Sequence, residues 1–392
     1  MSESKASIPP HEFPERWQRI QTLMRDRQLD LVLAYADDRA VFGPAHVRWL
    51  ADVPVHFEPF CVLIPKEGNP VLLCGPESDE YARLRGQMPD VRVLREFTHP
   101  DEDYPYANIQ SLTEIISDLG WSIADIQHVG IGGKALISAE TMQAFQQALP
   151  NVNWIDIEND LCGLRAVKSQ AERAVIRQAY QIAEIGLLAA VKAIQPGVSE
   201  RHVAAQAEVA MRMAGAEGTG IDTIVASGPN SRPILARTTF RQIAAHDAVL
   251  LTIAPRYEGY HGAIGRLVFV GQPDIEIEKA YRTAVQAQQA CGLALRTGLE
   301  GRQVEAIGRK IVQNAGYGSY FLYSGLHSLG VIEFEPPIFG PSSDAKLQEN
   351  MIISIDIPMF NTPWGGLRVE DGYCITSSGA DRMNNTEYFF YK

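Results

Sequence analysis

Apolar and polar positions along the first part of the chain predict short strands alternating with helices. Residues 13–28 place apolar side chains at helical spacing, and residues 29–34 (LDLVLA) follow as a strand. Further elements are a helix over 109–119 and strands over 60–64, 71–74, 91–94 and 128–131. This alternation is typical of an α/β domain. Residues 151–163 are expected to form its last strand and the linker out of the domain.

The pattern changes from Leu164 onward. We expect helices over 169–194, 199–214, 276–296 and 301–315, with strand-like segments over 222–270 and from 316 to the end. The sequence therefore predicts two domains, an N-terminal α/β domain over 1–163 and a second, α+β domain over 164–392.

The second domain contains an internal repeat. PGVSERHVAAQAEVAMRMAG (Pro196–Gly215) matches TGLEGRQVEAIGRKIVQNAG (Thr297–Gly316) at an offset of 101 residues. The strands after each helix also correspond, since LLTIAP and GYHGAIGRLVFVG parallel ISIDIP and WGGLRVEDGYCIT. Two copies favour a pseudo-twofold domain over a solenoid, which needs three or more repeats. Such a domain is expected to place a site between its two halves.

Charge and cysteine content exclude several classes of protein. With 35 Lys and Arg against 47 Asp and Glu, the net charge is −12, which disfavours nucleic acid and anionic membrane surfaces as partners. The sequence contains no run of 18 apolar residues and begins without a signal-peptide pattern, so we expect neither a membrane span nor secretion. The five cysteines form no C-x-x-C pair, which fits a reducing cytoplasm and free thiols.

Two segments of the second domain carry candidate acid–base groups. His327 lies in the turn-like SGLHSLG, and Glu333 and Glu335 follow at a spacing of two, which would place both on one strand face. Asp356 interrupts the apolar strand MIISIDIP, where a carboxylate is costly unless it is paired, bound to a metal or functional.

Two further segments add charged groups. In GGLRVEDG, Arg368 and Glu370 share a strand face and Asp371 points the other way, while GYHGAIGR contributes His261. Each of these residues has a structural explanation when taken alone, such as a structural histidine, a turn cap or an ion pair. Together they predict one shared site.

These motifs resemble the family of creatinase, Xaa-Pro aminopeptidases and prolidases, peptidase family M24. The matching segments, in chain order, are LRAVKSQAERAVIRQAYQIA, SGPNSRPILARTTFRQI, GYHGAIGR, SGLHSLG, NMIISIDIP and GGLRVED. The resemblance implies a pita-bread fold after a creatinase-type N-terminal α/β domain. It covers nearly the whole chain.

The departures from the family pattern concern its metal ligands. Metallopeptidases of the family bind two divalent ions through two Asp, one His and two later acidic residues. Here the two Asp positions are Thr252 and Ala263, whereas His327, Asp356 and Glu370 match the other three. Neither threonine nor alanine can bridge two ions, so we expect no dinuclear centre.

Creatinase, the metal-free member of the family, is also matched incompletely. Its catalytic histidine falls on Leu235, and the glutamate before Arg266 falls on Gly265. The family's second histidine falls on Phe334. The resemblance therefore implies a hydrolase that acts on a C–N bond, amide or amidine in type, of a small molecule. A peptidase of Xaa-Pro type with one metal ion and an inactive binding pseudoenzyme remain alternatives.

The expected site combines residues from both domains. The candidate catalytic residues are His327, Glu335, Asp356 and Glu370. The candidate substrate-binding residues are Tyr260, His261, Arg266, Arg368, His56 and Phe57. No cofactor is firmly predicted; a single ion of Mn, Fe or Zn would bind His327, Asp356 and Glu370.

A homodimer is implied by the resemblance, because creatinase-type enzymes place one N-terminal domain beside the partner's site. His56 and Phe57 belong to loop-like segments, as do residues 46–49, that are candidates for this contribution.

Overall fold

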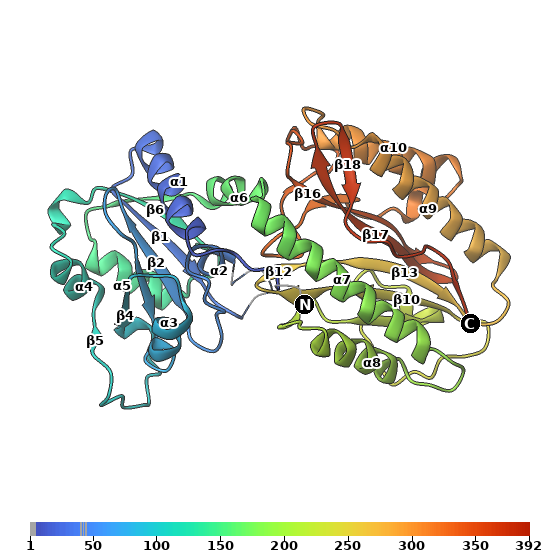
Figure 1. The fold of residues 1–392 in the computed structure, drawn as a ribbon, viewed down its shortest axis with the longest axis horizontal. Helices are drawn as coiled ribbons and strands as arrows, with labels where there is room; N and C mark the ends of the chain where they lie inside the picture. The colour runs from blue at the N-terminus through green and yellow to red at the C-terminus, as the bar shows by residue number, and fades with distance from the viewer. Residues whose placement is uncertain (1–4, 40, 42, 44) are drawn as a thin grey trace. The chain divides into compact units, whose positions relative to one another are not determined.

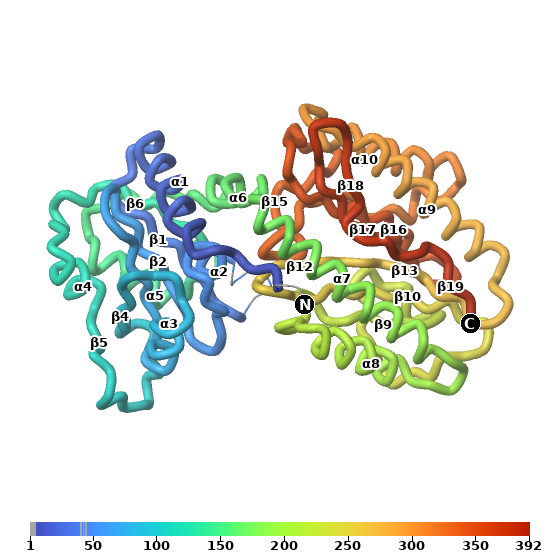
Figure 2. The backbone as a smooth tube through the Cα atoms, in the orientation of Figure 1, coloured from blue at the N-terminus to red at the C-terminus, as the bar shows by residue number. Residues whose placement is uncertain are grey.

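The chain folds into two compact units, each with its own sheet and core (Figures 1 and 2). The structure, a computed structural model, describes residues 5–39, 41, 43 and 45–392. The N-terminal unit comprises Pro9–Leu164, and the C-terminal unit comprises Arg165–Lys392 with residues 5–8.

The N-terminal unit is built on a seven-stranded sheet in the order β5-β4-β3-β2-β1-β6-β7. Only β2 runs antiparallel to its neighbours; the other described pairs are parallel. The strands are β1 (Leu31–Ala36), β2 (Phe60–Pro65), β3 (Val71–Cys74), β4 (Asp90–Leu94), β5 (Ile109–Gln110), β6 (His128–Gly132) and β7 (Asn153–Asp156). The helices are α1 (Glu12–Arg27), α2 (Ala45–Ala51), α3 (Asp79–Arg85), α4 (Leu112–Asp118), α5 (Ala139–Ala148) and α6 (Glu158–Ala166).

Helix α2 and helix α6 correct the sequence-based prediction. Residues 46–49, expected as a loop, lie in α2, whose side chains are all buried. Arg16 and Trp17 of α1 donate hydrogen bonds to the carbonyls of Trp49 and Leu50, at 2.7 and 2.9 Å. Partners from another element hold this short helix, since seven residues are too few for a stable isolated helix. Likewise, the expected linker before residue 163 is largely helix α6.

The C-terminal unit contains a nine-stranded sheet, whose central order is β15-β14-β16-β17-β13-β10-β9, and a three-stranded sheet β12-β11-β8. The strands are β8 (Gly218–Thr219), β9 (Ile224–Ser227), β10 (Ala248–Ile253), β11 (Pro255–Tyr257), β12 (Tyr260–His261), β13 (Ile264–Phe269), β14 (Leu326–Ser328), β15 (Glu335–Ile338), β16 (Ile352–Thr362), β17 (Gly365–Thr376), β18 (Gly379–Arg382) and β19 (Phe390–Tyr391). The helices are α7 (Gln170–Ala193), α8 (Glu200–Met213), α9 (Ile275–Ala294) and α10 (Gly301–Asn314).

The internal repeat corresponds to two similar halves of this unit. Helices α8 and α10 each have 14 residues, and they start 101 residues apart, as β13 and β17 do. Helix α7 packs with α8 and against β10 and β11, whereas α9 packs with α10 and against β16 and β17 (Figure 1). The two helix pairs and their strands form the pita-bread arrangement that the sequence predicted.

Helix α7 is long and apolar enough to span a membrane by length and composition alone. Half of the apolar window that passes this test is buried, and α7 is a central packing element of the unit. A helix that packs against strands and another helix needs apolar side chains for this packing. The five cysteines are unpaired and buried, as expected for small apolar side chains.

Candidate active site

Strand pairing in the C-terminal unit places Thr252, Glu370 and Asp356 in one row across the sheet, with Gly265 between the first two. Thr252 on β10 pairs with Gly265 on β13, Gly265 pairs with Glu370 on β17, and Glu370 pairs with Asp356 on β16. Directly paired residues project to the same face of a sheet. His327 on β14 is paired with Ser354, two residues before Asp356, and so lies next to this row.

His327 is held as a neutral imidazole with one nitrogen directed at the acidic residues. Its Nδ1 lies 2.9 Å from the carbonyl oxygen of Ser328, to which it donates, and its Nε2 lies 3.8 Å from Glu370 Oε1. Burial is the main reason that the pKa of His327 is lowered from its usual 6.5. Nε2 is therefore a lone-pair acceptor that faces another acceptor.

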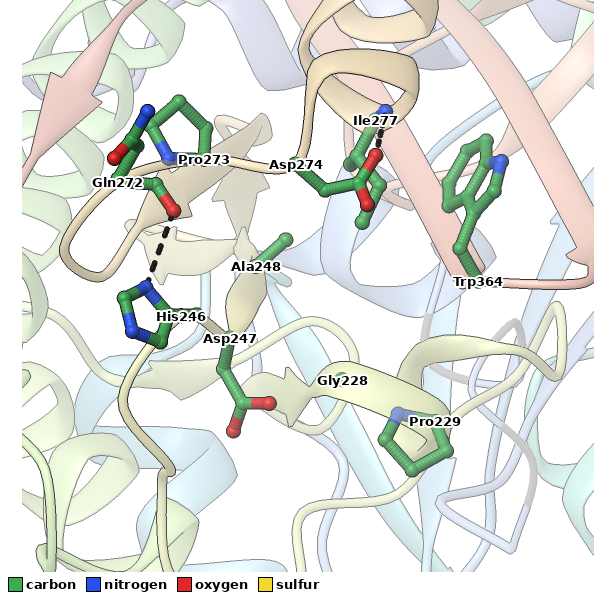
Figure 3. Close-up of a pocket in the computed structure, with 10 residues that line it drawn as sticks. All are labelled: Gly228, Pro229, His246, Asp247, Ala248, Gln272, Pro273, Asp274, Ile277 and Trp364. Atoms are coloured by element: carbon green, nitrogen blue, oxygen red, sulfur yellow. Dashed lines mark hydrogen bonds between the residues drawn. The ribbon is translucent and has the colours of Figure 1, made fainter.

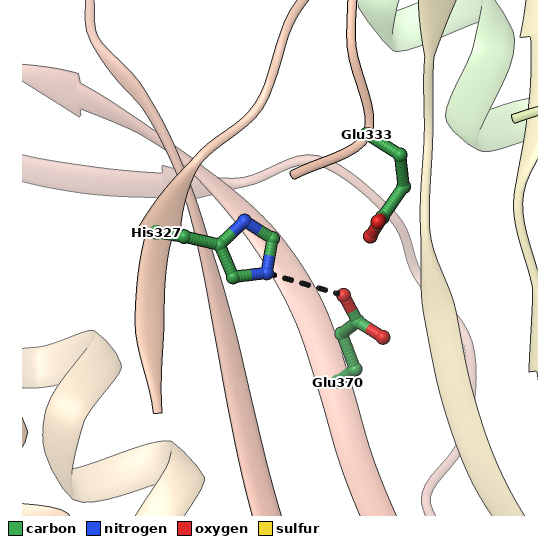
Figure 4. A group of neighbouring side chains, drawn as sticks. All are labelled: His327, Glu333 and Glu370. Carbon is green, nitrogen blue, oxygen red and sulfur yellow. Dashed lines mark ion pairs between the residues drawn. The ribbon is translucent and has the colours of Figure 1, made fainter. Parts of the chain in front are cut away.

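Glu333 and Glu370 form a carboxyl pair beside that imidazole (Figure 4). One ligand atom from each of His327, Glu333 and Glu370 lies within 4.8 Å of the other two. Burial, followed by the charge of Glu370, raises the pKa of Glu333 well above its usual 4.5. The protonated form of Glu333 is therefore favoured, and in this form it can donate a hydrogen bond to Glu370. Ser354 donates a second hydrogen bond, of 2.8 Å, to Glu370 Oε1.

Asp356 is held by a cation and a phenol. Its Oδ2 accepts a 2.7 Å hydrogen bond from Tyr323, and its Oδ1 lies 3.2 Å from Arg368 Nε in an ion pair. Oδ1 is buried and has no hydrogen bond among the described residues. Burial, only partly offset by Arg368, raises the pKa of Asp356 to about 6. This carboxyl group can gain or lose a proton near neutral pH.

The residues present do not fit a pair of metal ions. Thr252 and Ala263 carry no carboxylate, and Arg368 Nη1 donates a hydrogen bond of 3.3 Å to Thr252 Oγ1. A guanidinium therefore already lies between Thr252 and Asp356, and a second cation close to it would be repelled. One ion is a different case, because an imidazole and two carboxyl groups are a suitable donor set for Mn, Fe or Zn.

Glu335, expected to be catalytic, is engaged in a buried structural ion pair. Its Oε1 lies 2.7 Å from Lys168 Nζ and its Oε2 lies 3.4 Å from Arg165 Nε. The acidic residue that reaches His327 is Glu333. The spacing rule does not apply here, because β15 begins only at Glu335 and residues 330–334 form bends.

The first half of the unit contributes less to the cluster than the sequence suggested. Arg266 is fully buried and pairs with Asp371 at 2.7 Å, on the opposite face of β17 from Glu370. Tyr260 donates a 2.7 Å hydrogen bond to Glu172, and His261 Nδ1 lies 3.2 Å from the carbonyl of Gly330. These contacts tie α7 and the turn after His327 to β12.

His56 and Phe57 lie on the surface of the N-terminal unit. His56 pairs with Asp38 at 3.2 Å, and the Phe57 ring lies 4.7 Å from that of His99. They line a cavity of about 490 Å³ together with Tyr81.

Another cavity, of about 520 Å³, contains none of the predicted site residues (Figure 3). His246 and Trp364 contribute to its wall, His246 Nδ1 lies 3.3 Å from the carbonyl of Gln272, and Asp274 caps α9. Its polar groups are thus largely occupied by structural contacts.

Two residues of the site were missed in the sequence. Tyr323 has no motif around it, and its role depends on β16 and β17 bringing Asp356 and Arg368 to its hydroxyl. For Glu333 the sequence predicts only that it shares a strand face with Glu335. Its burial beside another carboxyl group depends on the tertiary structure, although its place between the apolar residues Ile332 and Phe334 already indicates burial.

Comparison with known families matches both units. The model of metallopeptidase family M24 matches residues 174–377, and that of the creatinase/prolidase N-terminal domain matches residues 16–167.

Individual relatives agree with these matches. An Xaa-Pro dipeptidase of Pyrococcus furiosus is 28% identical over 334 residues, covering 85% of this chain and 92% of the relative. One of Pyrococcus horikoshii is 32% identical over 331 residues, with 83% and 93% coverage. Among solved structures, a prolidase from Pyrococcus horikoshii OT3 superimposes with a TM-score of 0.83 at 24% identity, over 95% of this chain and 99% of that one.

Proposed function

Because the chain belongs to metallopeptidase family M24, we propose that it is a hydrolase that cleaves a C–N bond, amide or amidine in type, of a small molecule without a dinuclear metal centre. The observation that carries this proposal is the buried cluster itself. His327, Asp356 and Glu370 are kept at three motif positions, while Thr252 and Ala263 stand at the two positions that metal pairs require. Burying such ionisable groups is costly for folding, which favours a functional explanation.

Hydrolysis of a C–N bond needs an acceptor for a proton of the attacking water and a donor for the leaving nitrogen. We assign this proton transfer to Asp356, whose Oδ1 has no hydrogen bond among the described residues and whose pKa of about 6 suits both steps. Arg368 and Tyr323 act as positioning residues, because they hold the carboxyl group through its ion pair and its other oxygen.

His327 Nε2 and Glu370 Oε1 are acceptors 3.8 Å apart, so the group that binds between them has to be a hydrogen-bond donor or a cation.

The test is a cleavage assay of the purified full chain against Xaa-Pro dipeptides and a panel of small amides and amidines. Asp356→Asn is expected to lower kcat/KM by about 100-fold or more on any cleaved compound. The control is Asp222→Asn, which removes an exposed carboxylate paired with Arg237 and should leave kcat/KM unchanged. Cleavage by Asp356→Asn at the wild-type rate, or no cleavage of any compound, would contradict the proposal.

An Xaa-Pro peptidase with a single metal ion is the second candidate function. Two observations favour it: the relatives named Xaa-Pro dipeptidase and the three-residue cluster with metal-ligand spacing. Preferential cleavage of Xaa-Pro dipeptides over the other amides, lost with a chelator and restored by Mn²⁺, would select this candidate.

A further inference from the structure

The cluster of His327, Glu333 and Glu370 has the donor atoms and the spacing of a site for one ion. The three side chains are 2%, 6% and 1% exposed, and one donor atom of each lies within 4.8 Å of the other two (Figure 4). We propose that these three residues bind a single divalent ion of the Mn, Fe or Zn class. In this site Glu333, which lies outside the family's five ligand positions, supplies a carboxylate in addition to that of Glu370.

The orientation of His327 distinguishes this site from a simple group of acidic residues. Its Nδ1 donates to the Ser328 carbonyl at 2.9 Å, so the lone pair is on Nε2. Nε2 has no hydrogen bond among the described residues and is directed at Glu370 Oε1. A backbone carbonyl on the far nitrogen is the usual support of a metal-bound histidine, since it fixes both tautomer and ring orientation.

The two glutamates supply the negative charge. Two buried carboxylates at this separation are stable only when a cation lies with them, either a proton or a metal ion. Glu370 is also oriented by the 2.8 Å hydrogen bond from Ser354, as ligating carboxylates commonly are. The buried Lys168–Glu335 ion pair lies close to Gly330, at the start of the bend that carries Glu333.

Asp356 is not part of the proposed ligand set, which therefore differs from the expected set of His327, Asp356 and Glu370. Its Oδ2 is occupied by Tyr323, and its Oδ1 lies 3.2 Å from the Arg368 guanidinium, which would repel an ion there. Because Arg368 also contacts Thr252, the same cation disfavours a second ion on the other side. The stoichiometry should therefore be one ion per chain.

The inference rests on the proposed function only in requiring that no metal pair forms. Metal binding can be measured in the absence of any substrate. The full chain is dialysed against a chelator and titrated with Mn²⁺ and Zn²⁺ by calorimetry, with elemental analysis of the loaded protein. We expect one bound ion per chain. Glu333→Gln should weaken binding at least tenfold, because an amide is a much poorer ligand than a carboxylate.

The variants are chosen to keep the fold intact. The amide of Glu333→Gln can still donate to Glu370 as the protonated acid does, and thermal unfolding checks this. Glu349→Gln, an exposed position, is the matched control and should bind like wild type. Asp356→Asn should weaken binding less than Glu333→Gln does.

Three results would overturn the inference: two ions per chain, no binding by the folded wild type, or binding weakened by Asp356→Asn but not by Glu333→Gln. A failure of the proposed function appears separately, as a chain that binds one ion but cleaves none of the tested compounds.

Discussion

Glu335 forms buried ion pairs and is not one of the residues grouped around His327. Lys168 and Arg165 neutralise its charge in the interior, where all three residues are 3% exposed or less. An ion pair of this kind is costly to break from one side, because the remaining partner is left buried and charged.

We therefore predict that Lys168→Met lowers the free energy of unfolding by about 3 kcal/mol. Replacing all three members, as in Arg165→Met/Lys168→Met/Glu335→Leu, should recover most of that loss, since apolar replacement of a complete buried ion pair or triad is often neutral. Urea unfolding measures both variants. Equal losses in the single and triple variants would show that the three residues do not act as a unit.

Gly265 gives a second prediction at the scale of one residue. A Cβ at this position would lie 2.8 Å from Arg368 Cγ and 2.9 Å from Glu370 Cβ. Gly265→Ala should therefore displace both side chains and lower stability by about 1–3 kcal/mol. Gly379→Ala is the matched control, because nothing lies within 4 Å of the place that its new methyl group would take. Thermal unfolding that ranks Gly379→Ala as the more destabilised variant would contradict this explanation.

Strand pairing decides which side chains meet in the C-terminal unit. Thr252, Glu370 and Asp356 come from β10, β17 and β16, and each is placed by backbone hydrogen bonds rather than by neighbours in the chain. The alternation of β17 puts Glu370 in the cluster and Asp371 with Arg266 on the other face, as the sequence pattern indicated.

Asp30 links two elements of the N-terminal unit in a way that depends on pH. It accepts hydrogen bonds from the backbone N–H groups of Gln127 and His128, at 2.9 and 2.8 Å, and pairs with Lys66. Although burial acts to raise the pKa of Asp30, these contacts outweigh it and lower the pKa below 3.8. A carboxyl group whose pKa is lowered by folding stabilises the protein above its unfolded pKa and loses this effect as pH falls.

Asp30→Asn should accordingly destabilise the chain at neutral pH, by about 1 kcal/mol, and the difference from wild type should shrink as pH falls below 3.8. Chemical denaturation at a series of pH values measures this difference. A difference that grows on acidification would refute the assigned role.

For the whole molecule, the resemblance to creatinase-type enzymes predicts a homodimer. Light scattering should give about twice the chain mass of 43.3 kDa.

The expected role of His56 and Phe57 can be tested at Phe57, because its side chain is 60% exposed and its removal costs little packing. Phe57→Ala should lower activity without changing the unfolding temperature. Leu84→Ala, at 73% exposure in the same unit, is the control.

The sequence alone determined the order of motifs, the 101-residue repeat and the loss of the paired Asp positions at Thr252 and Ala263. Residue identities and the spacing between them can be read directly from the sequence. Helices α8 and α10 form where the repeat predicts them because helical periodicity is a local property of the chain. Only the tertiary structure decided that Glu333 rather than Glu335 faces His327, and that Arg368 lies against Thr252. The direction of a side chain in a turn depends on partners far along the chain: Lys168, which holds Glu335 away from the cluster, is 167 residues distant.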